Sequence, residues 1–270
     1  MKLKIGISPC PNDTYIFEAI FNNKFSLKDV EFEFVFEDVQ TLNELASDKQ
    51  LDIVKISYAH FFSLMDNYVM LRSGGALGNG VGPLLVSKKV IPENEVNNCS
   101  IAIPGVNTTA NFLLSFAFPE AKDRKAYSFD EIEKAVLNEK ADAGVIIHEN
   151  RFTYAEKGLR KIMDLGTYWE AETKLPIPLG GIAISRSLPL SVQQEVNNLI
   201  KKSIASANDN KEILSEFIKN NAQEMSEEVM KKHIALYVNS FSPDVGADGE
   251  KAVQKMKEIL DIKSEAKIFI

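Results

Sequence analysis

Cysteine and histidine are scarce in this chain. Cys10 and Cys99 are its only cysteines, and it has three histidines among 270 residues. Two cysteines are too few for a disulfide framework or a four-thiolate metal site, which fits a reducing compartment. The sequence also lacks the HExxH and CxxC spacings of common metal sites. We therefore predict that no metal is bound and that the protein is cytoplasmic.

Long apolar runs and excess positive charge are also absent. No segment approaches the roughly 18 consecutive apolar residues that suggest a membrane span. Residues 1–8 alternate polar and apolar side chains and contain no apolar core of a secretory signal, so they predict a first strand. The net charge of −7 argues against a general affinity for nucleic acid. We expect neither nucleic acid nor membrane as a partner, and the oligomeric state is left open.

Short apolar runs alternate with segments of helical period, which predicts an α/β fold with mostly parallel strands. A content of 45% hydrophobic residues allows the chain to bury a core. Helices are expected near 192–204, 229–238 and 250–260. The expected strands cover residues 3–7, 31–36, 51–56, 84–86, 100–103 and 143–147.

Two glycine-rich, strand-like passages, at residues 78–89 and 176–187, form a matched pair. If the chain leaves one lobe through the first and returns through the second, residues 1–88 plus 181–270 form a larger α/β lobe. Residues 89–180 then form a smaller inserted lobe, joined by two hinge crossovers with a ligand cleft between the lobes. Ordinary turn glycines in a single domain are the alternative. The GNGVG stretch precedes a strand and opens no helix, which argues against a dinucleotide loop.

Three segments share an order of apolar strand, short polar loop and helix, at residues 4–20, 51–64 and 100–118. Each places helix-starting N–H groups at the carboxyl end of a strand, where open α/β sheets bind ligands. Those groups favour a carboxylate or phosphate, so we expect a small-molecule carboxylate as the partner. Ser57, Thr108 and Thr109 add hydroxyl groups at the second and third loops. The alternative is that these hydroxyls only cap helices.

His148 directly follows an apolar strand that ends at Ile147. A free imidazole has a pKa of roughly 6.5, so it can accept a proton at neutral pH as a general base does. A hydrogen-bonded structural histidine is the alternative. His60 lies in an aromatic stretch and His233 on the apolar stripe of a late helix, and we predict packing roles for both.

The first loop, SPCPNDT at residues 8–14, combines two prolines with polar side chains. We predict that Asn12 or Asp13 caps a helix beginning near Thr14, and that Asp13 or Thr14 contacts substrate. Cys10 precedes the helix, where a thiol pKa can be lowered. A packing role for Cys10 is favoured over a nucleophilic one.

Four motifs together resemble one enzyme family, the 1,4-dihydroxy-6-naphthoate synthases of the futalosine route to menaquinone. They are SPCPNDT at 8–14, KISY at 55–58, GALGNGVGP at 75–83 and IIHENRFTY at 146–154. The resemblance implies a two-lobed periplasmic-binding-protein-like type II fold. It also implies a carbon–carbon lyase that acts on cyclic de-hypoxanthine futalosine without a cofactor.

The resemblance further implies roles for individual residues. His148 matches the proton-accepting histidine, while Lys55, Ile56, Ser57, Thr108 and Thr109 match ligand-binding positions. A base that removes a proton next to a carbonyl starts the elimination, and formation of an aromatic product drives it forward. Two alternatives remain open: a chorismate dehydratase of the same pathway, and a non-catalytic small-anion solute-binding protein of the same fold.

Overall fold

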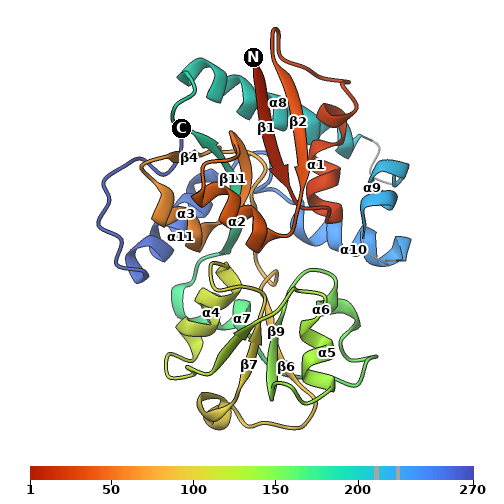
Figure 1. The fold of residues 1–270 in the computed structure, drawn as a ribbon, viewed down its shortest axis with the longest axis vertical. Coiled ribbons are helices and arrows are strands. Elements are labelled where there is room, and N and C mark those ends of the chain that lie inside the picture. Colours follow the sequence, from red (N-terminus) through yellow and green to blue (C-terminus); the bar gives the residue numbers. More distant parts are fainter. Residues whose placement is uncertain (210–212, 223–225) are drawn as a thin grey trace. The chain divides into compact units, whose positions relative to one another are not determined.

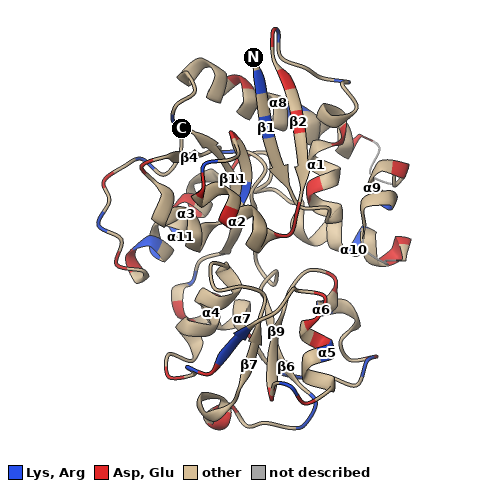
Figure 2. Cartoon of the chain, in the orientation of Figure 1, with Lys and Arg blue, Asp and Glu red and all other residues tan. Residues whose placement is uncertain are grey.

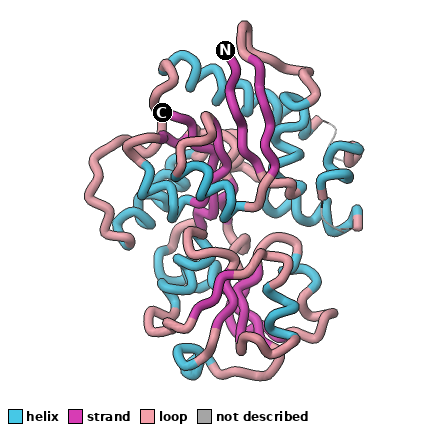
Figure 3. The backbone as a smooth tube through the Cα atoms, in the orientation of Figure 1, coloured by secondary structure: helices cyan, strands magenta, loops and turns pink. Residues whose placement is uncertain are grey.

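The computed structural model describes residues 1–209, 213–222 and 226–270. The chain packs as two compact units, one made of residues 1–78 and 178–270 and the other of residues 79–177. Each unit has its own β-sheet with helices packed around it (Figures 1 and 3). The predicted α/β class is confirmed.

The sheet of the first unit has the strand order β2-β1-β3-β11-β4, and β5 also pairs with β11. β1 runs parallel to both β2 and β3, whereas β11 is antiparallel to β3 and β4. The carboxyl ends of β1, β2 and β3 therefore lie at the same edge of this sheet. The strands are β1 (Lys2–Ile7), β2 (Glu31–Phe36), β3 (Ile53–Ser57), β4 (Tyr68–Met70), β5 (Ala76–Gly78) and β11 (Ile177–Ser185).

The core of the first unit lies between this sheet and two long helices, α1 (Pro11–Phe21) and α8 (Leu190–Asn208). Ile16 and Phe17 of α1 are buried there because they face apolar side chains of β1 and α8. The helices predicted near residues 192–204, 229–238 and 250–260 are confirmed as α8, α10 (Glu227–Tyr237) and α11 (Gly246–Ile259). The remaining helices of this unit are α2 (Val39–Ser47), α3 (Tyr58–Phe61), η1 (Phe62–Leu64) and α9 (Glu216–Asn221).

The sheet of the second unit has the order β10-β6-β9-β7-β8, in which β7 is parallel to β8 and β9. Figure 1 shows α4 and α7 on one side of this sheet and α5 and α6 on the other. The strands are β6 (Leu84–Ser87), β7 (Ile101–Ile103), β8 (Arg124–Ala126), β9 (Ala143–Ile146) and β10 (Arg160–Asp164). The helices are η2 (Glu93–Asn98), α4 (Thr109–Ala117), α5 (Ile132–Leu137), α6 (Asn150–Thr153) and α7 (Leu165–Thr173).

The boundaries of the two units differ from those predicted. The sequence placed them after residues 88 and 180, whereas the packing divides the chain after residues 78 and 177. The reason is β6, which pairs with β9 and β10 and so belongs to the second sheet. The glycine-rich stretch before β6 lies mostly in the second unit as well.

Charged residues of both signs are interspersed along the ribbon of each unit (Figure 2). One visible pairing is between the basic start of β1 and the acidic start of β2, where Lys2 Nζ lies 2.9 Å from Glu33 Oε2. Within the described residues, no helix combines the length and the hydropathy needed to cross a membrane.

Candidate active site

The loops after β1 and β3 lie at the same edge of the first sheet. β1 and β3 are parallel neighbours, with Ile5 opposite Ile53 in the register. β1 leads into the loop at Ser8 and then into α1, while β3 ends at Ser57 and leads into α3. This arrangement brings the first and second predicted loop segments together.

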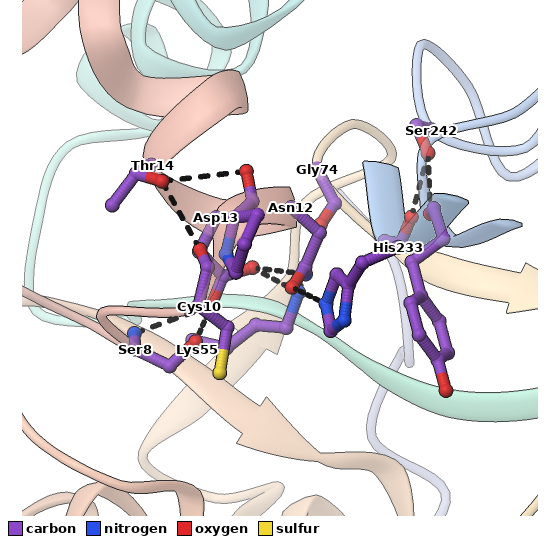
Figure 4. A network of polar contacts seen from close by, with 12 residues as sticks. Ser8, Cys10, Asn12, Asp13, Thr14, Lys55, Gly74, His233 and Ser242 are labelled. Carbon is purple, nitrogen blue, oxygen red and sulfur yellow. Dashed lines mark hydrogen bonds and ion pairs between the residues drawn. The ribbon is translucent and has the colours of Figure 1, made fainter. Parts of the chain in front are cut away.

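Asp13 and Lys55 form a buried ion pair at this edge (Figure 4). Lys55 Nζ lies 2.7 Å from Asp13 Oδ1, and Asp13 is fully buried while Lys55 is 7% exposed. Asp13 also accepts hydrogen bonds from Ser8 N at 3.2 Å, Ser8 Oγ at 2.7 Å and Asn12 Nδ2 at 2.8 Å. Burying two charges costs desolvation energy even when they are paired, so such a pair is a candidate functional group.

The start of α1 corrects the predicted cap. The helix begins at Pro11, and its N-cap residue Cys10 makes no side-chain capping bond. Proline suits this first helical position because its missing N–H would have no partner within the helix. Asp13 and Asn12 are therefore inside the first turn and make the contacts described above. Thr14 is fully buried, and its hydroxyl lies 3.2 Å from the Cys10 carbonyl, to which it donates.

Ser57 is held by a residue that the sequence did not single out. Asn43 of α2 is fully buried; its Oδ1 accepts from Ser57 N at 3.0 Å and its Nδ2 donates to Ser57 Oγ at 3.2 Å. Ser57 precedes α3 but makes no side-chain capping bond, so the capping alternative is wrong for this residue. Because Asn43 donates to the Ser57 oxygen, the hydroxyl hydrogen is directed elsewhere. Ile56 is fully buried and lies opposite Gly181 of β11 in the sheet.

The two threonines of the third segment lie in the second unit, at the start of α4. Thr108 is the N-cap: its Oγ1 accepts from Asn111 N at 3.2 Å and donates to the Gly105 carbonyl at 2.8 Å. Thr108 therefore caps α4, and its contact with substrate stays a prediction. Thr109 is the first helical residue and is 3% exposed, and its backbone N–H belongs to the first turn of α4.

His148 follows β9 at the same edge of the second sheet, since β7 and β9 are parallel neighbours. Its backbone is in the left-handed region, with φ of 57°. This conformation is uncommon for residues other than glycine, and such strain is found preferentially at functional sites. The imidazole is partly exposed and contacts the ring of Phe129, with ring centroids 5.1 Å apart.

Two carboxyl groups near the His148 loop each have one oxygen buried from solvent. Glu149 Oε2 and Glu133 Oε1 are buried oxygens without a hydrogen-bond partner among the described residues. Burial raises the pKa of Glu149, and the nearby carboxylates of Glu133 and Asp130 raise it further, against the opposing charge of Lys157. Lys157 also pairs with the other oxygen of Glu133. Sequence alone gave no signal for this cluster.

Arg151 connects the His148 loop to the glycine-rich motif. Its guanidinium donates to the Gly82 carbonyl at 2.6 Å and lies 3.5 Å from Asp164 Oδ2. Gly82 itself approaches the backbone of Gly166 at the start of α7 so closely that a Cβ would lie 2.3 Å from Gly166 Cα. Two of the motifs noted in the sequence therefore meet within the second unit.

The two histidines assigned to packing also form specific hydrogen bonds. His60 Nε2 lies 2.9 Å from Ser47 Oγ and 3.1 Å from the Asn43 carbonyl, and burial lowers the pKa of this imidazole. His233 is fully buried, as predicted, and its Nε2 lies 2.9 Å from Asn12 Oδ1. His233 therefore belongs to the same polar network as Asp13, which periodicity could not indicate.

Cys10 and Cys99 are both buried and free of disulfides. Across residues 1–209, 213–222 and 226–270, no group of three or more histidine, cysteine or acidic side chains is arranged to hold a metal ion.

Comparison with known structures supports the predicted fold. A Candida albicans protein described as having the generic periplasmic binding protein fold matches with a TM-score of 0.63, covering 100% of this chain and 98% of its own, at 14% identity. At that identity the likeness concerns the fold alone. A crystal structure of an Archaeoglobus fulgidus protein matches more closely, with a TM-score of 0.89 and 34% identity over 97% of each chain.

Sequence comparison identifies enzymes among the relatives. A 1,4-dihydroxy-6-naphthoate synthase from Thermus thermophilus is 42% identical over 94% of this chain and 92% of its own. The Streptomyces coelicolor protein of the same name is 36% identical over 93% of this chain and 90% of its own. A family model described as menaquinone biosynthesis matches residues 3–261. This chain therefore belongs to the menaquinone biosynthesis family.

Proposed function

We propose that this protein is a carbon–carbon lyase that releases 1,4-dihydroxy-6-naphthoate from cyclic de-hypoxanthine futalosine. The observation that carries the proposal is the 42% identity to the Thermus thermophilus synthase over 94% of the chain. The identity of the substrate is the one implied by the family resemblance of the four sequence motifs. As a biosynthetic enzyme, the protein is proposed to act in the cytoplasm on a small carboxylate, without nucleic acid or membrane as a partner.

His148 is the proposed general base. It lies at the carboxyl end of β9, where open α/β sheets place ligands, and its left-handed backbone supports a functional role. The imidazole removes a proton next to a substrate carbonyl, and the electron pair moves onto the carbonyl oxygen to give an enolate. When that pair returns to form a carbon–carbon double bond, the bond to the sugar-derived fragment breaks. The fragment leaves with the bonding electron pair and takes up the proton held by His148. Formation of the aromatic ring makes the sequence favourable, and no step is assigned to a cofactor.

Three of the remaining predicted residues, Lys55, Ser57 and Thr109, are proposed to bind the anionic oxygens of the substrate. In the first unit, Ser57 donates its hydroxyl hydrogen and Lys55 contributes a positive charge fixed by Asp13. In the second unit, the first-turn N–H groups around Thr109 are suited to an oxyanion. The ligand cleft expected from the family resemblance stays a prediction, so each set of residues is tested separately.

One assay distinguishes the proposed reaction from its alternatives. The purified protein is incubated separately with cyclic de-hypoxanthine futalosine and with chorismate, and the products are identified by mass spectrometry. Release of 1,4-dihydroxy-6-naphthoate from the first substrate alone is the expected result. Loss of water from chorismate would identify a dehydratase instead. Turnover of neither substrate would contradict the proposed lyase activity.

A further inference from the structure

His233 is a fully buried imidazole to which the proposed reaction assigns no role. It lies on α10, and its Nε2 is 2.9 Å from Asn12 Oδ1, a residue 221 positions earlier in the chain. Figure 4 shows Asn12 between this imidazole and Asp13. The contact therefore joins a helix of the C-terminal third to the first turn of α1.

The direction of each hydrogen bond in this network follows from its chemistry. Asn12 Nδ2 lies 2.8 Å from Asp13 Oδ1, and an ionised carboxylate can only accept. The amide nitrogen of Asn12 must then face Asp13, which turns its oxygen toward His233. Since that oxygen can only accept, Nε2 of His233 carries the hydrogen.

Asp13 is saturated with donors. A carboxylate offers about four acceptor sites, and Asp13 receives four hydrogen bonds. Two reach Oδ2 from Ser8, while Asn12 and Lys55 share Oδ1. Asn12 is therefore the direct neighbour of the Lys55 ammonium on the same oxygen, and the orientation of its amide affects where that ammonium rests.

Lys55 keeps donor capacity beyond this pair. Its Nζ is 2.7 Å from Asp13 Oδ1 and 3.5 Å from the Gly74 carbonyl, the second being at the limit of a hydrogen bond. An ammonium has three hydrogens, so at least one has no acceptor among the described residues. That hydrogen is suited to an anionic oxygen of a ligand.

We infer that His233 and Asn12 are positioning residues for Lys55. The imidazole orients the Asn12 amide, the amide orients the Asp13 carboxylate, and the carboxylate fixes the ammonium so that its remaining hydrogen meets a substrate carboxylate or enolate oxygen. This inference rests on the proposed function for the identity of the substrate, but not for the network itself.

Four variants separate positioning from simple packing. His233→Phe removes the hydrogen donated to Asn12 and keeps a ring, whereas His233→Gln restores a donor. The double variant Asn12→Leu/His233→Phe replaces both partners with apolar groups, so neither is left buried and unpaired. Ile234→Val is the matched control, because it alters the same helix at a buried apolar residue outside the network.

Two measurements are made on each variant of the full chain. Calorimetric titration with 1,4-dihydroxy-6-naphthoate gives ligand affinity, and ¹⁵N–¹H spectra report the buried Lys55 ammonium, assigned by its loss in Lys55→Met. We expect about tenfold weaker binding and a lost or shifted ammonium signal for His233→Phe. His233→Gln and Ile234→Val keep both near wild type. The double variant regains thermal stability but not affinity.

Two results would overturn the inference. One is a folded double variant with wild-type affinity and an unchanged ammonium signal. The other is His233→Gln being as impaired as His233→Phe, since the donated hydrogen would then be irrelevant. A wild-type protein that neither binds nor releases the naphthoate refutes the proposed function instead, and the ammonium spectra still test the network.

Discussion

Lys55 Nζ lies 2.7 Å from Asp13 Oδ1, with both side chains withdrawn from solvent. The two partners are unequal within the described part of the chain, because Asp13 accepts from three other donors while Lys55 has only a marginal second acceptor. Removing the carboxylate therefore leaves a buried ammonium and several buried donors poorly paired. Removing the ammonium leaves a carboxylate that is still hydrogen-bonded.

We expect the two single variants to differ accordingly in stability. Asp13→Asn should lower the free energy of unfolding by about 3 kcal/mol, whereas Lys55→Met should lower it by about 1 kcal/mol. Urea denaturation measures both. Glu228→Gln, which breaks an exposed pair with Lys232, is the control and should have no measurable effect. Equal losses for Asp13→Asn and Lys55→Met would contradict the asymmetry.

The contact between Asn43 and Ser57 predicts a non-additive effect on ligand binding. Asn43→Asp places a carboxylate where the amide donated to Ser57 Oγ, so the hydroxyl hydrogen turns toward the new acceptor and is lost to the ligand. Asn43→Asp and Ser57→Ala should each weaken naphthoate binding about fivefold to tenfold. The double variant should bind no more weakly than Ser57→Ala alone, as a double-mutant cycle by calorimetry would reveal.

A variant on the surface of the same helix serves as the control for this cycle. The Gln40 side chain donates to Glu44 on the exposed part of α2, so Gln40→Ala should bind normally. Additive losses from Asn43→Asp and Ser57→Ala would show that Asn43 acts on binding independently of the hydroxyl.

The left-handed backbone of His148 predicts the order of stability among variants at this position. Asparagine and glycine tolerate the left-handed region, whereas alanine is strained there. His148→Ala should therefore be about 1 kcal/mol less stable than His148→Gly, although both lose the contact with Phe129. His148→Asn should keep folding and naphthoate binding while losing most turnover. Near-normal kcat in that variant would exclude His148 as the base.

Local patterns in the sequence were sufficient for the strands that position the site. β1, β2, β3, β6, β7 and β9 were all expected, because their apolar residues either alternate with polar ones or form a short continuous run. The strands β4, β5, β8 and β10 were not, since their pairing depends on neighbours distant in the chain. The lobe boundary was displaced for the same reason: β6 belongs to the sheet with which it pairs.

The candidate site could also be predicted only in part from the sequence. Strand-end loops placed Ser57 and His148 at sheet edges, and the resemblance supplied their proposed roles. Asn43 and His233 were missed because their importance lies in contacts with Ser57 and Asn12 that only the tertiary fold creates. Asp13 was expected as a cap or a substrate contact, but its burial and its four donors give it the geometry of a support for Lys55.

Two glycines in one motif predict different costs for the same substitution. A Cβ on Gly82 would lie 2.3 Å from Gly166 Cα and 2.5 Å from Gly166 N, so backbone must move. Gly82→Ala should lower the free energy of unfolding by about 3 kcal/mol. Gly80 has φ of +67° and open space around it, so Gly80→Ala should cost only about 1 kcal/mol. Thermal unfolding of both variants tests this; equal costs would contradict the close approach.

The raised pKa of Glu149 predicts how stability changes with pH. Burial and the carboxylates of Glu133 and Asp130 hold this pKa above its ordinary value of 4.5, so the folded state keeps a proton that the unfolded state has released. The contribution is fully present below pH 4.5 and is lost as pH rises through the raised pKa. Glu149→Gln cannot ionise, so its advantage in melting temperature over wild type should grow from acidic to neutral pH.

Glu139 provides a control of opposite sign. Its exposed carboxylate pairs with Lys88, which lowers its pKa, so its contribution is present at neutral pH and is lost as pH falls. Any benefit of the Glu139 charge is small because the pair is exposed to solvent. Glu139→Gln should therefore melt slightly below wild type at neutral pH and converge with it in acid. Melting curves of Glu149→Gln that stay parallel to wild type across the whole pH range would contradict the assigned environment of Glu149.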